Sequence, residues 1–141
     1  MYIGRIVAVG GTPAGDAVAA YRVSSRSFPH RRCVTNDAGI AVLPEPGYEE
    51  DLEKNPYIAY NCLRLTGPYA VATNGAHTDP ITEKLMHGTD PRDALIATLY
   101  GMDYEHDHLS TPRVAAVVSA DASAAYLGII RKDALLVRAF S

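Results

Sequence analysis

The sequence has 141 residues, of which 48% are hydrophobic and 21% are charged, and its formal net charge is −3. This length suits one domain with a single core, and this composition argues against a disordered chain. The net charge excludes the global positive field with which proteins bind nucleic acid non-specifically, so an anionic ligand would need a local basic pocket.

Neither a membrane span nor a disulfide framework is expected. No apolar run is long enough to cross a bilayer, and the N-terminal residues lack the pattern of a secretory signal. The two cysteines, Cys33 and Cys62, lack the C-x-x-C spacing of a zinc or redox site. These features predict a cytoplasmic protein with reduced thiols that contacts neither membrane nor nucleic acid.

The first third of the chain predicts two β-hairpins. Residues 2–9 read as a strand, a turn rich in glycine and proline follows, and residues 17–24 alternate so that Tyr21 and Arg22 lie on opposite faces. The segments RRCVT and IAVL, joined by the turn NDAG, predict the second hairpin. Residues 44–56 then hold at most a short polar helix.

The middle of the chain predicts a third hairpin and two helices. The segments YIAYNCLRL and YAVATNG flank the turn TGP. Asp79 and Pro80 then have the pattern of a helix N-cap and first helical residue, and Gly88 marks the end of that helix. Asp90 and Pro91 open the next helix in the same way. One side of this second helix carries Ala94, Leu95, Thr98, Leu99 and Met102.

The last third predicts a three-stranded meander formed by RVAAVVS, AAYLGIIR and LLVRAF. About nine strands joined by short turns, with the helices grouped in mid-chain, predict an α+β fold with mainly antiparallel sheets. Because the last strand runs almost to Ser141, the sequence leads us to expect that the native chain continues beyond this residue.

The stretch YRVSSRSFPHRR is the first candidate for a ligand site. Arg22 stands between apolar residues of a strand, and an arginine that faces inward there needs an anionic partner. Guanidinium groups bind phosphate in bidentate fashion, and the hydroxyls of Ser24 and Ser25, with Arg26, add donors. The alternative is a solvated loop whose arginines are unconnected.

Three further stretches carry polar side chains that suit catalysis or binding. Tyr60 and Asn61 are either site residues or ordinary strand residues. Glu105 lies in a polar stretch after the second helix, where a carboxyl in a dry cleft could act as general acid or base. In TNGAHTDP, Asp79 is explained as a helix cap, which leaves Asn74 and His77 as candidates for substrate contact.

The histidines also allow a metal site, but no metal is the favoured expectation. His106 and His108 are two residues apart, and His77 and Asp79 could add ligands. Strict ligand spacing and a third anchored ligand are missing from this set.

Several of these stretches, taken together, resemble the archaeal-type IMP cyclohydrolases. The resemblance runs in order from residue 2 to about residue 138 and is carried by AYRVSSRSFP, NPYIAYNC, TNGAHTDPITEKL, PRDAL, MDYE, TPRVAAV and AYLGIIRKD. It implies a single domain over residues 1–141, and a four-layer αββα sandwich similar to N-terminal nucleophile hydrolases. It also implies closure of 5-formamidoimidazole-4-carboxamide ribonucleotide to inosine monophosphate, without a cofactor. The implied partner is a small purine nucleotide, and a homo-oligomer is compatible with the resemblance.

The resemblance also implies roles for individual residues. The catalytic residues of the family match Arg22, Tyr60, Asn61 and Glu105. As hypotheses, Arg22 with Ser24, Ser25 and Arg26 holds the 5′-phosphate or orients the carboxamide. Tyr60 and Asn61 hydrogen-bond the formyl oxygen or the base edge, and Glu105 moves protons. Asn74 and His77 line the pocket, while Arg113 neutralises charge.

Two departures from the family pattern qualify this expectation. Family members are longer, so a C-terminal strand or helix is expected to be missing here. Residue 2 is Tyr2 rather than Cys, Ser or Thr, so a self-processed N-terminal nucleophile is not expected. Three other functions stay open on the sequence: a nucleotide-binding module without catalysis, a metal-dependent amidohydrolase using His77, His106 and His108, and a structural subunit.

Overall fold

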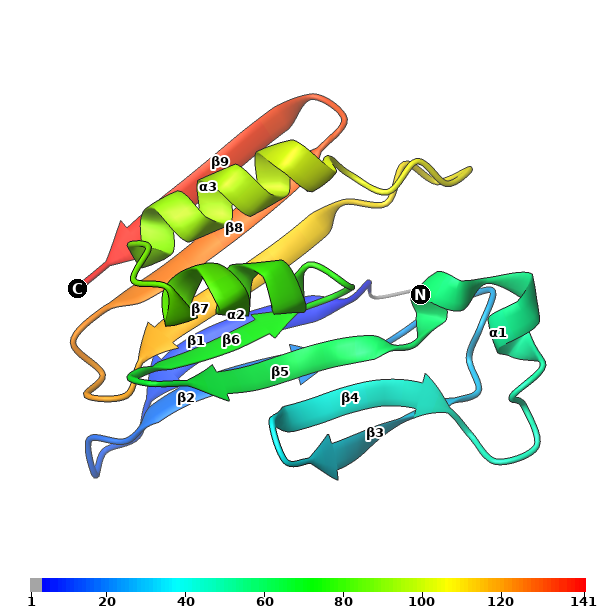
Figure 1. Cartoon of the computed structure of the whole chain (residues 1–141), viewed down its shortest axis with the longest axis horizontal. Helices are drawn as coiled ribbons and strands as arrows, with labels where there is room; N and C mark the ends of the chain where they lie inside the picture. Colours follow the sequence, from blue (N-terminus) through cyan, green and yellow to red (C-terminus); the bar gives the residue numbers. More distant parts are fainter. Residues whose placement is uncertain (1–3) are drawn as a thin grey trace.

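A computed structural model describes residues 4–141, which form one seven-stranded antiparallel sheet and one separate hairpin (Figure 1). The strands of the large sheet follow the chain order from β3 to β9 without a crossover. They are β3 (Arg31–Asn36), β4 (Gly39–Pro44), β5 (Tyr60–Thr66), β6 (Tyr69–Thr73), β7 (Arg113–Ser119), β8 (Ala125–Arg131) and β9 (Ala134–Phe140). The separate hairpin pairs β1 (Ile6–Gly11) with β2 (Ala17–Arg22).

The predicted hairpins and the C-terminal meander are confirmed, as is the α+β class. The first strand begins later than expected, at Ile6. Residues 2 and 3 of the expected strand lie outside the described residues, so the structure says nothing about Tyr2. The second strand ends at Arg22 rather than at Ser24. The short polar helix is present as α1 (Asp51–Lys54) and is followed by a 3₁₀ turn, η1 (Pro56–Ile58).

The two mid-chain helices are α2 (Thr78–Met86) and α3 (Pro91–Met102). The cap of α3 is confirmed, since the side chain of Asp90 accepts a hydrogen bond from the backbone N–H of Arg92 at 3.0 Å. The predicted cap of α2 is wrong, because the N-cap is His77 and Asp79 lies inside the first turn. The helix starts earlier because the hydroxyls of Thr73 and Thr78, 2.7 Å apart, close the preceding turn.

Helices α2 and α3 cover one face of the large sheet, and the β1–β2 hairpin packs on the other face, over β5, β6 and β7 (Figure 1). The core between helices and sheet contains Val71, Ile81, Leu85, Ala94, Leu95, Ala115 and Val117. Gly128 lets α3 approach the sheet, since a Cβ at this position would come within 2.8 Å of Leu99 Cδ1.

The described residues therefore form three layers: helices, large sheet and hairpin. The expected fourth layer, a second set of helices, is not formed by residues 4–141. The outer face of the hairpin is correspondingly open, with Ile6 44% and Val18 41% exposed. No helix among the described residues is long and apolar enough to cross a membrane.

Candidate functional site

One cavity of about 630 Å³ gathers several of the polar side chains that the sequence singled out. It lies at the end of the molecule where the start of β1, the loop after β2, η1 and the loop after α3 come together (Figure 1). Its lining includes Arg5, Ser25, Arg26, Arg31, Asn74 and Glu105. Basic side chains outnumber acidic ones in this lining, which suits an anionic ligand.

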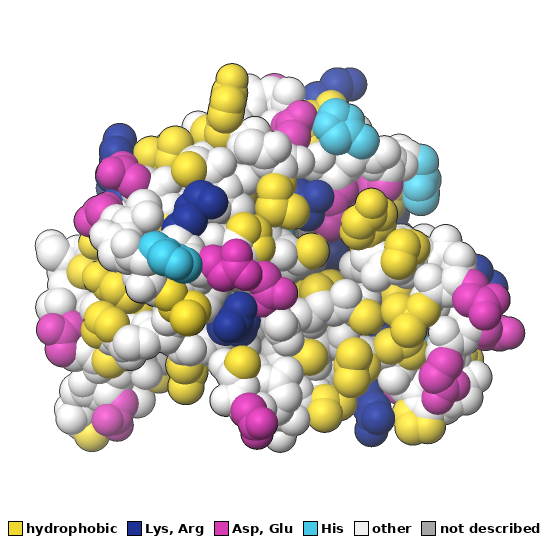
Figure 2. Space-filling view, in the orientation of Figure 1, with side chains coloured by type: hydrophobic (Ala, Val, Ile, Leu, Met, Phe, Trp, Pro, Cys, Tyr) yellow, Lys and Arg dark blue, Asp and Glu magenta, His cyan; other side chains and the backbone are white. Residues whose placement is uncertain are grey.

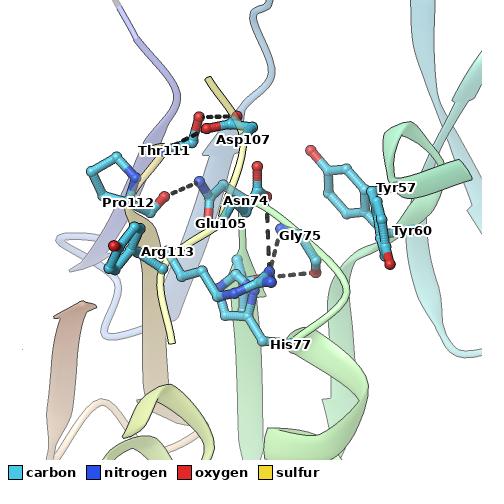
Figure 3. A network of polar contacts seen from close by, with 12 residues as sticks. Tyr57, Tyr60, Asn74, Gly75, His77, Glu105, Asp107, Thr111, Pro112 and Arg113 are labelled. Carbon is cyan, nitrogen blue, oxygen red and sulfur yellow. Dashed lines mark hydrogen bonds and ion pairs between the residues drawn. The ribbon is translucent and has the colours of Figure 1, made fainter. Parts of the chain in front are cut away.

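Glu105 is the carboxyl group at the centre of this site. Its side chain is 22% exposed and lies 4.0 Å from Arg5 Nη2 and 3.8 Å from Arg113 Nη1. Figure 3 shows Glu105 with Arg113 beside it. Burial raises the pKa of the Glu105 carboxyl, and this effect outweighs the positive charges of Arg5, Arg113 and Arg31, which lower it; the negative charge of Asp107 also raises it. A carboxyl whose pKa lies above its usual range is better placed to exchange protons near neutrality.

The two arginines are held in place by main-chain carbonyl groups. Arg5 Nη1 donates to the carbonyl of Asn74 at 3.2 Å, and Arg113 Nε donates to the carbonyl of Asp103 at 2.7 Å. Neither guanidinium makes a short hydrogen bond with the carboxylate of Glu105, because both nitrogen–oxygen distances exceed 3.5 Å. The carboxylate is therefore held by loose ion pairs, and its oxygens are not tied to either arginine by a short hydrogen bond.

Tyr60 contributes a buried hydroxyl next to Arg5. Its oxygen is 2.6 Å from the hydroxyl of Tyr21. Burial raises the pKa of Tyr60, while Arg31 and Arg5 lower it. Tyr60 is not among the described residues that line the cavity, so its hydroxyl lies behind the cavity wall.

Asn74 and His77 hydrogen-bond the backbone around the start of β7, and Nδ1 of His77 is buried without a hydrogen-bond partner among the described residues. The amide of Asn74 donates to the carbonyl of Pro112 and accepts from the N–H of Val114, both at 2.9 Å, and so extends the pairing of β6 with β7. His77 is fully buried, and its Nε2 donates to the carbonyl of Val114 at 2.9 Å. Asn74 lines the cavity and His77 lies beneath it, so the predicted substrate contact of His77 is not favoured by the geometry.

The fold and this cavity can be compared with known proteins. The sequence pattern of the IMP cyclohydrolase-like protein family matches residues 2–141. A protein named IMP cyclohydrolase from Halobacterium salinarum is 54% identical over 139 residues, which cover 99% of this chain and 68% of the relative. A relative of the same name from Methanocella arvoryzae is 53% identical over 141 residues, which cover 99% of this chain and 68% of the relative. Another from Methanosphaera stadtmanae is 42% identical over 138 residues, which cover 98% of this chain and 67% of the relative.

The chain belongs to the IMP cyclohydrolase-like family. It spans about two thirds of the length of these relatives. The resemblance indicated by the sequence motifs is thereby confirmed.

Arg22, which the resemblance assigned to catalysis, is exposed on the outer face of β2. The expectation that its side chain faces inward is wrong, and it is not among the described residues that line the cavity. The physical reason is the alternation of the strand: Tyr21 packs inward against Tyr60, so the next side chain must point outward. In this IMP cyclohydrolase-like chain, Arg5 occupies the inward position expected for Arg22.

Asn61 also lies away from the cavity, on the helix side of the large sheet. Its amide donates to the carboxylate of Asp79 at 3.0 Å, and Arg64 Nη1 donates to the same oxygen at 3.1 Å. Both side chains reach Asp79 because a β-bulge in the pairing of β4 with β5 inserts Cys62 and shifts the register. Tyr60 and Asn61 therefore face opposite sides of the sheet, so the geometry does not favour contact of both with one ligand, and their site roles stay predictions.

The serine and arginine run after β2 lies partly in the cavity wall. Ser25 and Arg26 line the cavity, whereas Ser24 is half-buried outside the described lining. The Oγ of Ser25 accepts a hydrogen bond from the N–H of Phe28 at 3.1 Å, which shapes the loop. Arg113 lies beside Glu105, as a charge-neutralising group would, and its role stays a prediction.

The histidines of the metal alternative are not brought together. His77 is buried beside β7, whereas His106 and His108 are exposed on the loop after α3. His106 Nε2 lies 3.0 Å from the carboxylate of Asp103. Within residues 4–141, no three His, Cys, Asp or Glu side chains are grouped so that they could hold a metal ion.

Arg5 is the site residue that sequence reasoning missed. It precedes β1 and shares the parity of Val7 and Val9, which are the more buried positions of that strand. Because side chains alternate along a strand, this parity was the available signal that the guanidinium faces the interior.

Replacing Arg5 by glutamine is expected to raise the pKa of Glu105 further. The positive charge of Arg5 favours the ionised carboxylate, so its removal favours the protonated form. The measurement is a titration of the Glu105 carboxyl by carbon-13 NMR. Arg92→Gln, the same substitution at an exposed residue of α3, should leave the pKa of Glu105 unchanged. If the pKa of Glu105 falls or stays constant in Arg5→Gln, Arg5 does not act on Glu105.

Proposed function

We propose that this chain is an IMP cyclohydrolase that closes 5-formamidoimidazole-4-carboxamide ribonucleotide to inosine monophosphate with loss of one water. Its family membership supports the reaction, and the relatives that share its sequence carry that name. The observation that carries the proposal is the half-buried Glu105 between Arg5 and Arg113, because ring closure requires proton transfers next to a developing negative charge.

In the first step the carboxamide nitrogen attacks the formyl carbon of the same molecule. The nitrogen loses a proton, and the formyl oxygen gains one. The raised pKa of Glu105 supports a role in both transfers, since one carboxyl that takes up and releases a proton near neutrality can serve the two atoms in turn. The product of this step is a cyclic carbinolamine.

In the second step the carbinolamine loses its hydroxyl group as water. The carbon–oxygen bond breaks after Glu105 donates a proton to the hydroxyl, and the proton on the former formamido nitrogen is released as the C=N bond to that nitrogen forms. No covalent bond to the protein is needed. The proposed contribution of the protein is therefore to hold the substrate folded on itself, to stabilise charge and to move protons.

Arg5 and Arg113 are proposed to stabilise the negative charge that develops on the formyl oxygen. Their guanidinium groups are fixed by the carbonyls of Asn74 and Asp103, so they need little reorganisation when the charge appears. Tyr60, whose hydroxyl is 2.6 Å from that of Tyr21, is proposed to support this end of the site from behind the cavity wall. Arg22 and Asn61 are not included in these roles.

The finer points of the fold are also proposals. We propose that the complete fold of the family adds a second helical layer on the outer face of β1 and β2, which would give the four-layer sandwich. The exposed apolar side chains Ile6 and Val18 on that face support this arrangement, as does the greater length of the relatives.

The test of the function is turnover by this chain. Incubation with the formamido ribonucleotide should produce an ultraviolet absorbance change that matches, mole for mole, the inosine monophosphate found by chromatography. Addition of a chelator should leave the rate unchanged. Binding of inosine monophosphate without turnover would instead support the nucleotide-binding module, and activity lost with a chelator and regained with zinc would support the metal-dependent alternative.

A further inference from the structure

His77 is fully buried, and one of its two ring nitrogens has no hydrogen-bond partner among the described residues. Burial lowers the pKa of His77 to about 4, so the ring is neutral near pH 7. Nε2 lies 2.9 Å from the carbonyl oxygen of Val114. Since a carbonyl oxygen only accepts hydrogen bonds, Nε2 carries the ring proton, and the unpartnered Nδ1 carries a lone pair. A buried acceptor without a donor is destabilising, so its presence calls for an explanation.

Nδ1 of His77 borders a small space that it shares with Arg113. A Cβ at Gly75 would lie 3.2 Å from Nδ1 of His77 and 3.4 Å from Nη1 of Arg113. The two nitrogens therefore flank the α-carbon of Gly75, and Figure 3 shows the end of the Arg113 side chain beside the His77 ring. Nη1 is also the atom of Arg113 that lies 3.8 Å from the carboxylate of Glu105. The same nitrogen thus has two acceptors nearby, a neutral lone pair and a carboxylate.

We propose that His77 is a positioning residue, whose Nδ1 lone pair attracts the guanidinium of Arg113 and keeps it from closing on Glu105. The bond from Arg113 Nε to the carbonyl of Asp103, 2.7 Å long, anchors one nitrogen but does not stop the group from turning about it. A guanidinium at hydrogen-bonding distance would hold the carboxylate ionised. The lone pair keeps the ion pair at 3.8 Å and so leaves the carboxyl able to take up a proton. The catalytic value of this arrangement rests on the proposed function.

Gly75 belongs to the same arrangement because it leaves the space between the two nitrogens free. Its backbone does not have the positive φ that would by itself require glycine. The close approach of His77 and Arg113 is therefore the reason that a side chain is excluded here. An alanine methyl at this position would separate Arg113 from the lone pair.

The test is a carbon-13 NMR titration of the Glu105 carboxyl in the parent, His77→Leu and His77→Gln. His77→Leu removes the lone pair, so Arg113 closes on the carboxylate, and the pKa of Glu105 is expected to fall by about 1 unit. His77→Gln supplies both a donor for the carbonyl of Val114 and an acceptor oxygen, and should keep the pKa of Glu105 near the parent value. Turnover of His77→Leu should show a kcat about 3- to 10-fold lower, with KM within about 3-fold of the parent.

The competing explanation is a structural role, in which His77 only satisfies the carbonyl of Val114. A double-mutant cycle with Arg113→Gln separates the two explanations. If His77 acts through Arg113, His77→Leu should shift the pKa of Glu105 by less than about 0.3 unit once Arg113 is glutamine. An equal shift in both backgrounds would overturn the proposal, as would an unchanged or raised pKa in His77→Leu alone.

Gly75→Ala provides a second test that leaves His77 in place and serves if His77→Leu does not fold. It should also lower the pKa of Glu105, and an unchanged pKa would overturn the proposal. Gly101→Ala is the matched control, since a Cβ at Gly101 meets nothing within 4 Å, and it should leave the pKa unchanged. The titrations need no turnover, so a chain that shows these shifts but does not close the ring would refute the proposed function alone.

Discussion

Glu105→Gln is expected to lower the rate of ring closure about 100- to 10,000-fold, which is the usual contribution of a positioned general acid or base. Glutamine has nearly the same size and can still hydrogen-bond, but it cannot exchange a proton near neutrality. Because the change leaves the cavity shape intact, binding of inosine monophosphate should stay within about 3-fold of the parent value. The measurement is turnover followed by ultraviolet absorbance, together with calorimetric binding.

Glu83→Gln provides the matched control for this prediction. Glu83 is an exposed residue of α2, away from the cavity lining, and the substitution is chemically the same. Its rate should equal that of the parent. A Glu105→Gln chain with near-parental turnover would show that another group moves the protons.

His77 is expected to make the folded chain sensitive to acid. Burial lowers the pKa of His77 to about 4, and the nearby charges of Arg113 and Arg5 lower it too, whereas the hydrogen bond to Val114 raises it. The unfolded chain therefore binds a proton at this histidine below about pH 6.5, while the folded chain does not until about pH 4. In that window the free energy of unfolding falls as the pH falls, by about 2 kcal/mol between roughly pH 7.5 and pH 5.

The difference between parent and His77→Gln isolates this effect. The glutamine amide can still donate to the carbonyl of Val114 but does not titrate. Glu105, whose raised pKa favours the protonated folded state, acts in the opposite direction and is common to both chains. Denaturant unfolding should show the loss in the parent and in His87→Gln, an exposed histidine, but not in His77→Gln. The same loss in all three chains would contradict the prediction.

The strands and helices could be predicted from the sequence because they rest on local patterns. Turn residues separate the two strands of each hairpin, and apolar residues alternate along the strands. The Asp90–Pro91 pair marks the beginning of α3. The start of α2 could not be predicted in the same way, since its turn is closed by the hydroxyls of Thr73 and Thr78, five positions apart, and this contact competes with the cap pattern of Asp79.

The site was only partly predictable, and the reasons are specific to each residue. Glu105 was found because it is a carboxyl in a polar loop within a family motif. The inward orientation expected for Arg22 is wrong because side chains alternate along β2. Tyr21 faces inward, so the guanidinium of Arg22 lies on the opposite face of the strand. Asn61 contacts Asp79 because a β-bulge shifts the register of β5, and the sequence pattern does not predict an extra residue in this strand.

The surface charges agree with the exclusion of a broad basic field. On the face seen in Figure 2, lysine and arginine side chains are interspersed with aspartate and glutamate, and no large area carries a single sign. The local excess of positive charge lies instead in the cavity lining, at Arg5, Arg26, Arg31 and Lys54. This distribution suits a small anionic ligand.

The central claim is that a purine nucleotide occupies the cavity with its base against Glu105. A crystal structure of the chain with inosine 5′-monophosphate tests this most directly. The account predicts that the nucleotide lies in this cavity and that its six-membered ring contacts the carboxyl group of Glu105 and the guanidinium group of Arg5. A nucleotide bound elsewhere, such as against the exposed face of β2 at Arg22, would contradict it.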